Sequence, residues 1–300
     1  MAESFSETGF LDALFPMLQS SEDILLPPGD DCAVINAGSK KLALTVDQVI
    51  EGRHYLKEDG PFAAGRKLMA RNLSDLAAVG AEPLFALSSS ASSSDKGQEW
   101  LLDFHRGILA EAEKYNVLLI GGDLASTLSE TVNSLTLIGE IKGNTAARAG
   151  AVPGDLLYVT GEFGRSFETK HHLTFTPKVE EGIWLSQLCS AMIDVTDGLL
   201  IDALRVSRAS GLGLIINPET IPARDDAVIK HKLTDGEDYE LLFAVSPENE
   251  EKLINNWPFS SPLTNIGCFC SDVQSGIALD PSGEDLSLLY GTGFDHFSES

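Results

Sequence analysis

Cysteine is scarce in this chain: its 300 residues include four, Cys32, Cys189, Cys268 and Cys270. That number is too small for the disulfide framework of a secreted domain of this length. The Cys-x-Cys pair at 268 and 270 also lacks the second pair of ligands that a zinc site needs. We therefore expect four reduced thiols and no bound zinc.

Long apolar runs are also missing. No segment approaches the roughly 18 apolar residues of a membrane-spanning helix, and the first residues lack the basic start and apolar stretch of a signal peptide. The composition, 43% hydrophobic and 22% charged, is typical of a globular chain that can bury a core. These features predict a cytoplasmic protein with no membrane partner.

Basic residues are few: 21 Lys and Arg stand against 45 Asp and Glu, which gives a formal net charge of −24. This excess argues against a nucleic-acid partner, because phosphate contacts need clustered basic side chains. Small phosphorylated ligands stay compatible with the charge if divalent cations lie between phosphate and carboxylate. Mg²⁺, which prefers oxygen ligands, is the cofactor that this balance favours.

Three common motifs are absent: the phosphate loop G-x-x-x-x-G-K-[ST], the dinucleotide motif G-x-G-x-x-G and the zinc motif H-E-x-x-H. What recurs instead is aspartate beside glycine or at the end of an expected element. These aspartates are Asp30, Asp31, Asp47, Asp75, Asp123, Asp194 and Asp197. Several acidic segments that converge in the fold would bind several hard cations.

Most of these aspartates also have a purely structural interpretation. Asp30-Asp31 is typical of a solvated turn, and Gly121-Gly122-Asp123 is typical of a tight turn. Asp75 lies one helical turn after Arg71 and can pair with it.

The same holds for three other polar sites. Asp194 or Thr196 can cap a helix, with Asp197 favoured by the helix dipole. His54 can be a packed or surface histidine. The pair His171-His172 is expected in a loop.

Hydrophobic periodicity predicts a mixed α+β fold rather than a doubly wound parallel sheet. The predicted strands are 42–47, 117–120, 134–141, 156–160, 213–216 and 239–245, and the predicted helices are 61–80, 98–115, 179–189, 194–209 and one after Pro247. The turn-rich stretch 147–155 predicts a domain boundary near residue 150.

Two of these elements carry polar residues on one face. In the strand 42–47, Thr45 and Asp47 point the same way, opposite an apolar face that includes Val46. In the helix 61–80, Arg71 and Asp75 lie away from the apolar stripe of the helix. The segment 117–120 is expected to be a buried strand.

Six segments, in order along the chain, together resemble thiamine-monophosphate kinases. They are residues 29–34 (GDDCAV), 45–47 with 51–55 (TVD, EGRHY), 72–83 (NLSDLAAVGAEP), 121–123 (GGD), 194–199 (DVTDGL) and 236–241 (GEDYEL). The blocks 72–83 and 236–241 are the most specific. The wider superfamily, with aminoimidazole ribonucleotide synthetase and selenophosphate synthetase, shares the acidic ATP site.

The resemblance implies an aminoimidazole ribonucleotide synthetase-like fold with two domains. Residues 1–150 would form an N-terminal domain that binds ATP and Mg²⁺ and pairs its strands across a homodimer. Residues 151–300 would form a C-terminal α/β domain that completes the cleft for ATP and substrate.

The resemblance also implies roles for individual residues. The metal ligands would be Asp30, Thr45, Asp47, Asp75, Asp123, Asp194 and Asp197; the ATP contacts would be Gly122, Asp123, Arg148 and Thr196; the contacts to thiamine monophosphate would be His54, Glu237 and Phe294 of the segment 293–297. Asp235 departs from the family pattern, which has glycine there, so we expect a less comfortable positive φ. Val46 replaces a frequent hydroxyl residue, and 165–177 is shorter than the family segment.

These residues predict an ATP-dependent kinase that converts thiamine monophosphate to thiamine diphosphate by direct in-line transfer. A phosphate monoester is mostly a dianion at neutral pH, so no general base and no catalytic side chain are expected. Two alternatives remain open. One is another ATP-dependent enzyme of the superfamily, a cyclising ligase or selenophosphate synthetase. The other is a non-catalytic nucleotide-binding sensor.

Overall fold

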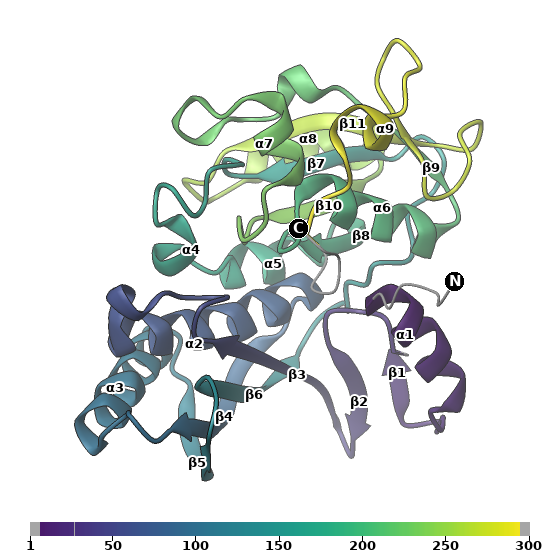
Figure 1. The fold of residues 1–300 in the computed structure, drawn as a ribbon. Helices are drawn as coiled ribbons and strands as arrows, with labels where there is room; N and C mark the ends of the chain where they lie inside the picture. The colour runs from purple at the N-terminus through teal and green to yellow at the C-terminus, as the bar shows by residue number, and fades with distance from the viewer. Residues whose placement is uncertain (1–6, 27, 295–300) are drawn as a thin grey trace.

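The computed structural model describes residues 7–26 and 28–294, which form two sheet-containing units that meet along one long helix (Figure 1). The N-terminal unit lies below and the C-terminal unit above in this view. Each unit contains one six-stranded sheet of mixed strand directions. The α+β class is therefore confirmed. Within the described ranges, no helix has the length and apolar character needed to cross a membrane.

The N-terminal sheet has the strand order β1-β2-β3-β6-β4-β5. Its strands are β1 (Ile24–Leu26), β2 (Ala33–Ala37), β3 (Lys40–Ile50), β4 (Glu82–Ser93), β5 (Leu118–Thr127) and β6 (Val132–Ile141). Neighbours pair antiparallel, except that β5 runs parallel to β4 at the sheet edge. The predicted strands 42–47 and 134–141 lie within β3 and β6.

The helices of this unit are α1 (Glu7–Leu14), α2 (Gly60–Val79) and α3 (Gln98–Lys114), with short 3-10 turns at Phe15–Met17 and Lys57–Asp59. The predicted helices 61–80 and 98–115 are confirmed as α2 and α3. Helix α2 has Pro61 in its first turn and ends at Gly80, whose φ of 72° is the left-handed conformation that glycine adopts without strain. Its apolar stripe, including Leu73, is completely buried.

The C-terminal sheet has the order β12-β9-β11-β7-β10-β8. Its strands are β7 (Leu156–Thr160), β8 (Cys189–Asp194), β9 (Gly213–Ile216), β10 (Leu241–Val245), β11 (Leu263–Cys270) and β12 (Ala278–Leu279). Its helices are α4 (His171–Thr174), α5 (Val179–Leu185), α6 (Leu199–Ser210), α7 (Ile229–Thr234), α8 (Pro247–Asn256) and α9 (Leu286–Tyr290), with 3-10 turns at Pro218–Thr220 and Arg224–Asp226.

Helix α2 belongs to both units. It packs against α3, β3 and β6 on one side and against α4, α5 and β8 on the other. One hydrophobic cluster joins Leu73 and Leu137 of the N-terminal unit to Met192 and Phe243 of the C-terminal sheet. The polar side chains of α2 are therefore held at the junction of the two units, where a site between them would lie.

Four predicted elements need correction. The helix predicted at 194–209 begins only at Leu199, as α6, and Asp194 still belongs to β8. The strand at 117–120 is not buried: β5 continues to Thr127, and Leu118 and Ile120 are 60% and 58% exposed, because β5 is an edge strand. The pair His171-His172 begins the short helix α4 instead of lying in a loop. The helix predicted at 179–189 ends at Leu185, and Cys189 already begins β8.

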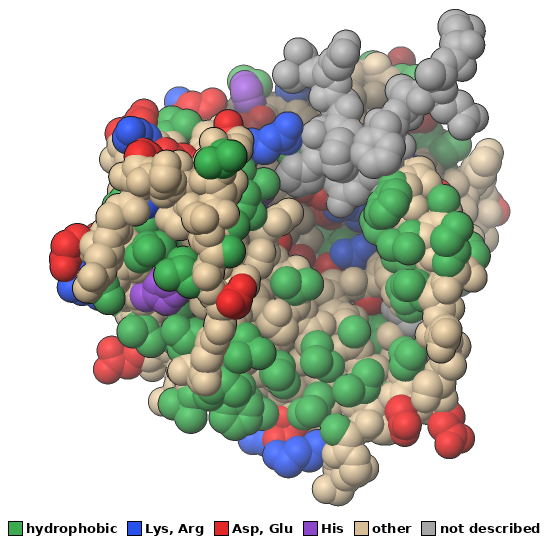
Figure 2. All heavy atoms as spheres, turned by 60° about the horizontal axis from the view of Figure 1, so that its bottom comes forward, with side chains coloured by type: hydrophobic (Ala, Val, Ile, Leu, Met, Phe, Trp, Pro, Cys, Tyr) green, Lys and Arg blue, Asp and Glu red, His purple; other side chains and the backbone are tan. Residues whose placement is uncertain are grey.

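The outer face of the N-terminal sheet is apolar, and no residue of 7–26 or 28–294 covers it. Figure 2, turned so that the lower side of the molecule comes forward, shows hydrophobic side chains spread over this region. Exposed apolar residues of its strands β3, β4 and β5 include Val46, Phe85, Leu87, Leu118 and Ile120. We call these five residues the outer face. The apolar side of the strand 42–47 was thus predicted, but Val46 is 67% exposed.

Candidate active site

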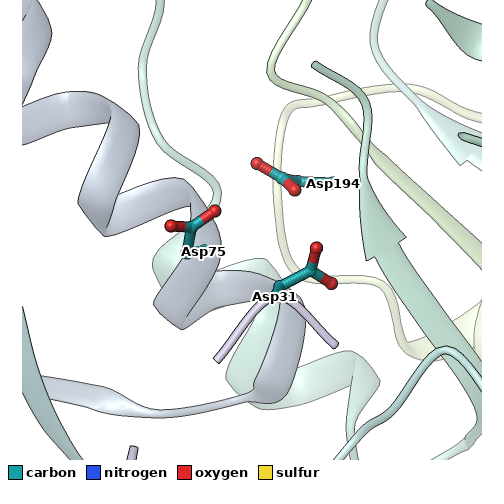
Figure 3. A group of neighbouring side chains, drawn as sticks. All are labelled: Asp31, Asp75 and Asp194. Carbon is teal, nitrogen blue, oxygen red and sulfur yellow. The ribbon is translucent and has the colours of Figure 1, made fainter. Parts of the chain in front are cut away.

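Three carboxylates from separate parts of the chain converge at the junction of the units. Asp31 precedes β2, Asp75 lies in the last part of α2, and Asp194 ends β8 (Figure 3). One oxygen from each lies within 4.8 Å of the others. We call these three residues the acidic trio.

Burial and mutual repulsion act on the trio. Burial, followed by the charges of Asp194 and Asp47, raises the pKa of Asp75 well above its usual range. Burial, followed by the charge of Asp31, does the same to the pKa of Asp194. Crowded, desolvated carboxylates are costly when ionised, and a bound cation removes that cost.

Each carboxylate of the trio has one oxygen held by the protein. Thr45 Oγ1 donates to Asp75 Oδ2 at 2.5 Å, Ser74 Oγ donates to Asp194 Oδ2 at 2.6 Å, and Arg148 pairs with Asp31 Oδ1. Asp31 Oδ2 is buried without a hydrogen-bond partner. The other oxygens of Asp75 and Asp194 likewise accept nothing from the described parts of the chain. These free oxygens fit a hard divalent cation such as Mg²⁺.

The neighbouring Asp30 turns away from the trio. Its Oδ1 accepts a hydrogen bond of 2.7 Å from the Arg148 backbone N–H, and burial raises the pKa of its carboxyl. Arg148 also donates to the carbonyl of Gly29 at 2.9 Å. The segment 29–31 is thus a loop fixed by one arginine and not the solvated turn of the structural alternative. Asp31, which sequence reasoning did not choose as a ligand, occupies the position facing Asp75 and Asp194.

Thr45 and Asp47 lie on β3 beside the trio, as their shared strand face predicts. Asp47, however, is occupied by an arginine: Arg71 Nε lies 2.7 Å from Asp47 Oδ2 and Arg71 Nη2 lies 2.8 Å from Asp47 Oδ1. The alternative pairing of Arg71 with Asp75 is therefore wrong. Asp47 of β3 binds Arg71, whereas Asp75 accepts a hydrogen bond from the hydroxyl of Thr45.

Gly122 and Asp123 are not brought to the trio in one chain. They lie within β5 and not in a tight turn, so that alternative is wrong. The register aligns Asp47 with Leu135, Leu135 with Ser88, and Ser88 with Gly122, which separates Asp47 from Gly122 by two intervening strands. Gly122 and Asp123 instead line a cavity of about 590 Å³ beside α3.

Thr196 and Asp197 follow β8 and lead into α6. Their backbone N–H groups donate to Asp202 Oδ2 at 2.9 and 3.1 Å, and Asp197 pairs with Arg205 at 2.6 Å. The helix-capping interpretation of Asp194 and Thr196 is wrong, because Gly198 is the N-cap and no side chain caps it. Asp202 takes the role of anchoring this turn.

His54 and Glu237 meet at one buried lysine that sequence reasoning missed. Lys67 Nζ donates to the His54 carbonyl at 2.6 Å and pairs with Glu237. The Lys67 side chain is completely buried, and burial lowers its pKa to about 8 although Glu237 opposes the shift. His54 is itself buried and accepts from the Ile50 N–H at 3.0 Å through Nδ1. Its packed environment agrees with the structural alternative.

The spacing of the charged residues along α2 could have indicated the role of Lys67 and Arg71 from the sequence. Lys67, Arg71 and Asp75 stand four residues apart on α2, so their side chains lie in one row along the helix. A charged row on a helix that is otherwise largely buried indicates a site, because unpaired charges are costly there.

Phe294 lines a second cavity, of about 450 Å³, together with Phe167, Asp235, Gly236 and Tyr290. The Phe294 ring is 49% exposed, and its backbone N–H donates to the Asp197 carbonyl at 2.9 Å. Phe297, the other aromatic residue of the segment 293–297, is outside the described residues.

The expected strain at Asp235 is absent. Asp235 has φ −70° and ψ 138°, an ordinary extended conformation, and it accepts from the Arg165 N–H at 2.7 Å. The positive φ values of this loop fall instead on Glu237 (65°) and Tyr239 (52°). The glycine-like conformation therefore lies two residues later than the sequence suggested.

Comparison with known proteins gives one consistent family. Residues 29–141 match the model of the AIR synthase related protein, N-terminal domain, and residues 137–256 match that of the C-terminal domain. The chain is 32% identical to the thiamine-monophosphate kinase of Salmonella typhimurium, covering 97% of this chain and 98% of that protein. The thiamine-monophosphate kinase of Escherichia coli K12 matches with the same identity and the same coverage of both chains.

The fold comparison agrees. A solved structure described as AaThiL complexed with AMPPCP and TMP superposes with a TM-score of 0.85 at 27% identity, covering 97% of both chains. A thiamine monophosphate kinase structure from Aquifex aeolicus gives a TM-score of 0.78 at 26% identity, covering 93% of this chain and 97% of that one.

Proposed function

The chain belongs to the thiamine-monophosphate kinase family, and on that premise we propose that it transfers the terminal phosphoryl group of ATP to thiamine monophosphate, giving thiamine diphosphate and ADP. The relative of similar fold that binds AMPPCP and TMP supports ATP and thiamine monophosphate as the two substrates. The observation that carries the proposal is the row on α2. It places the acidic trio at one end and the Lys67–Glu237–His54 group at the other.

The reaction needs positioning and charge neutralisation more than acid–base chemistry. The acceptor phosphate has a second pKa near 6, so at neutral pH it is mostly a dianion and already nucleophilic. Its oxygen forms a bond to the terminal phosphorus of ATP, and the bond from that phosphorus to the bridging oxygen of ADP breaks. The transition state is loose, so aligned phosphates and nearby positive charge lower the barrier. The chain supplies no general base in this proposal.

The trio fits Mg²⁺, since one oxygen of each member lies within 4.8 Å of the others, and Asp31 Oδ2 is buried with no hydrogen-bond partner among the described residues. We propose Asp31, Asp75 and Asp194 as the central ligands, with Asp30, Thr45, Asp47, Asp123 and Asp197 as further ligands. Bound Mg²⁺ supplies positive charge that offsets the phosphates of ATP. The carboxylates hold that charge at the junction of the units.

The nucleotide and acceptor contacts follow from the same site. Arg148 and Thr196 adjoin the trio through Asp31 and the end of β8, and we propose that they contact ATP. His54, Glu237 and Phe294 would hold thiamine monophosphate. We keep the division into domains 1–150 and 151–300, which is supported by the end of one sheet at Ile141 and the start of the other at Leu156. A cytoplasmic location stays a prediction.

We also propose a homodimer formed through the outer face. Five large apolar side chains on one sheet face would be costly to leave in water. Strand β5 lies at the edge of the sheet, where its backbone can pair with a strand of a second sheet. A second copy there would also give Gly122 and Asp123 a role, because in one chain they lie away from the trio. In this proposal they reach the trio of the partner subunit.

The direct test is product formation. Purified protein is mixed with ATP, Mg²⁺ and thiamine monophosphate, and ADP and thiamine diphosphate are separated by chromatography, with thiamine as the control acceptor. Thiamine diphosphate formed only from the monophosphate supports the proposal. ATP bound without turnover of either acceptor contradicts it and favours a sensor. ADP formed with another phosphorylated acceptor favours a different enzyme of the superfamily.

A further inference from the structure

Arg71 is the one charged side chain of the α2 row that the proposed reaction has not used. Two arms of its guanidinium bind both oxygens of Asp47, at 2.7 and 2.8 Å. The third arm, Nη1, forms only a long ion pair with Glu237 Oε1, at 3.8 Å, which is beyond hydrogen-bond distance. Nη1 donates to no other group in residues 7–26 and 28–294. Its N–H groups are therefore available to a ligand.

The position of Arg71 separates two parts of the site. Asp75 of the acidic trio lies four residues after it on α2, and Lys67, which pairs with Glu237, lies four residues before it. The side chain is 13% exposed, so it is mostly enclosed but still reaches the surface of the site. Asp47 anchors the guanidinium plane, so little rotamer entropy remains to be lost on binding an anion.

The chemistry of the proposed transfer requires an anion at this point. The terminal phosphate of ATP must lie near the carboxylates that hold cations, whereas the ring system of the acceptor lies near Glu237. The phosphate of the acceptor must then lie between them. Asp47 and Glu237 repel a dianion there, and the guanidinium of Arg71 is the group whose planar fork matches phosphate oxygens.

We propose that Arg71 binds the phosphate of the acceptor and positions it for attack on ATP. This inference rests on the proposed function and adds to it a residue that selects a phosphorylated acceptor over the free alcohol. A purely structural alternative exists, because Arg71 also joins β3 to the loop of Glu237. The two roles predict different results when Arg71 is replaced. Loss of a phosphate contact weakens the binding of thiamine monophosphate alone, whereas loss of a structural contact changes the binding of thiamine monophosphate and thiamine equally.

The test compares thiamine monophosphate with thiamine, which lacks the phosphate. Dissociation constants of both are measured by calorimetry with Mg²⁺ and a non-hydrolysable ATP analogue, for the unchanged chain and for Arg71→Gln. A direct guanidinium–phosphate contact predicts that thiamine monophosphate binds about 10- to 100-fold more weakly to the variant, with thiamine changed by less than about threefold. Equal weakening of both ligands, or of neither, overturns the proposal.

The matched control is Arg66→Gln on the same helix. Arg66 also joins the two units, through hydrogen bonds to the carbonyls of Leu173, Thr174 and Phe175, but it faces away from the acidic trio. The Arg66→Gln variant should have a lower melting temperature but an unchanged ratio of the dissociation constants for thiamine monophosphate and thiamine. A change of that ratio in Arg66→Gln as large as in Arg71→Gln also overturns the proposal.

A second variant guards against a folding defect. Arg71→Lys keeps the positive charge but loses the fork, so we expect an intermediate ratio and a higher KM for thiamine monophosphate with an unchanged KM for ATP. A ratio like that of the unchanged chain would contradict a role of the fork. If the unchanged chain forms no thiamine diphosphate, the proposed function itself is wrong. If it forms thiamine diphosphate, but Arg71→Gln and Arg71→Lys keep its ratio of the two dissociation constants, only the role of Arg71 is wrong.

Discussion

The buried ammonium of Lys67 pairs with Glu237 and donates to the His54 carbonyl at 2.6 Å. One cation on α2 thereby fixes two residues that come from distant parts of the chain. The pair is buried, so removing one partner leaves the other charge uncompensated. We therefore expect Lys67 to position the two proposed acceptor contacts, His54 and Glu237.

In the proposed site, this pair would make acceptor binding sensitive to alkaline pH. The Lys67 pKa is lowered to about 8, so the ammonium loses its proton as pH rises through that value and Glu237 loses its partner. We expect the KM for thiamine monophosphate to rise above about pH 8 and the KM for ATP to stay constant. Steady-state kinetics between about pH 6 and about pH 10 measure this.

The Lys67→Met variant should start with a high KM for thiamine monophosphate that no longer changes with pH in this range. Stability moves in the other direction: the unfolded pKa of 10.5 lies above the folded value, so deprotonation of Lys67 raises the unfolding free energy between about pH 8 and 10.5. The exposed Lys40, changed to Met, is the control. A persistent alkaline change in Lys67→Met would contradict the assignment.

We expect the acidic trio to lower the stability of the metal-free protein while it provides the ligands for Mg²⁺. The folded pKa of Asp75 is raised, so the folded state holds its proton more tightly than the unfolded chain does. The contribution of this group to the unfolding free energy is therefore largest at low pH and falls as pH rises above 3.8. Asp75→Asn removes that penalty, and we expect a higher Tm without metal by calorimetry.

The same variant should lose the gain in Tm that Mg²⁺ gives the unchanged chain, and turnover should fall about 100-fold or more. Asp194→Asn should have the same effects, because the carboxylate of Asp194 is also buried and its pKa is also raised. Asp280→Asn is the control, since Asp280 lies next to an exposed turn, at residues 281–284, far along the chain from the trio. A Mg²⁺ effect on Tm that survives in both trio variants would contradict the metal site.

The close contact between α2 and α5 predicts that one methyl group added at Gly182 lowers the unfolding free energy. A Cβ at Gly182 would lie 2.1 Å from the carbonyl oxygen of Ala77, so the helices must separate to admit alanine. We expect Gly182→Ala to lower the unfolding free energy by about 1–3 kcal/mol in denaturant titrations. Gly97→Ala, where the added Cβ meets nothing within 4 Å, is the control. Equal stability of both variants would show that the two units do not pack as described.

Local patterns predicted the two longest helices, α2 and α3, well. Helix α2 was readable from its apolar period, the proline at its start and Gly80 at its end, because each of these acts within a few residues. Strand β4 was missed, since its inward side carries Ser88, Ser90 and Ser92 while apolar Leu87 faces out. An inverted pattern of this kind is what the proposed homodimer would explain, because a second copy would cover the outward apolar side chains.

The site was only partly predictable for a similar reason. Aspartates could be chosen by type and by resemblance, but the choice between Asp30 and Asp31 depends on Arg148, which is more than a hundred residues away. The pairing of Arg71 with Asp47 instead of Asp75 likewise depends on how β3 lies against α2. Such contacts are tertiary, and helical spacing alone does not decide them.

The outer face supplies the last prediction. Ile120 is 58% exposed and Val46 67% exposed, so a charge at either position costs little in the single chain but much in a buried interface. We expect the unchanged protein to have the mass of a dimer by size-exclusion chromatography with light scattering, and Ile120→Glu and Val46→Glu to be folded monomers. Leu288→Glu, at an 86% exposed position of the C-terminal unit, is the control and should remain dimeric. If Gly122 and Asp123 act on the trio of the partner subunit, the monomeric variants should also lose turnover while keeping their fold. Monomeric variants with full turnover would mean that one chain holds a complete site, and Asp123 would then have no part in it.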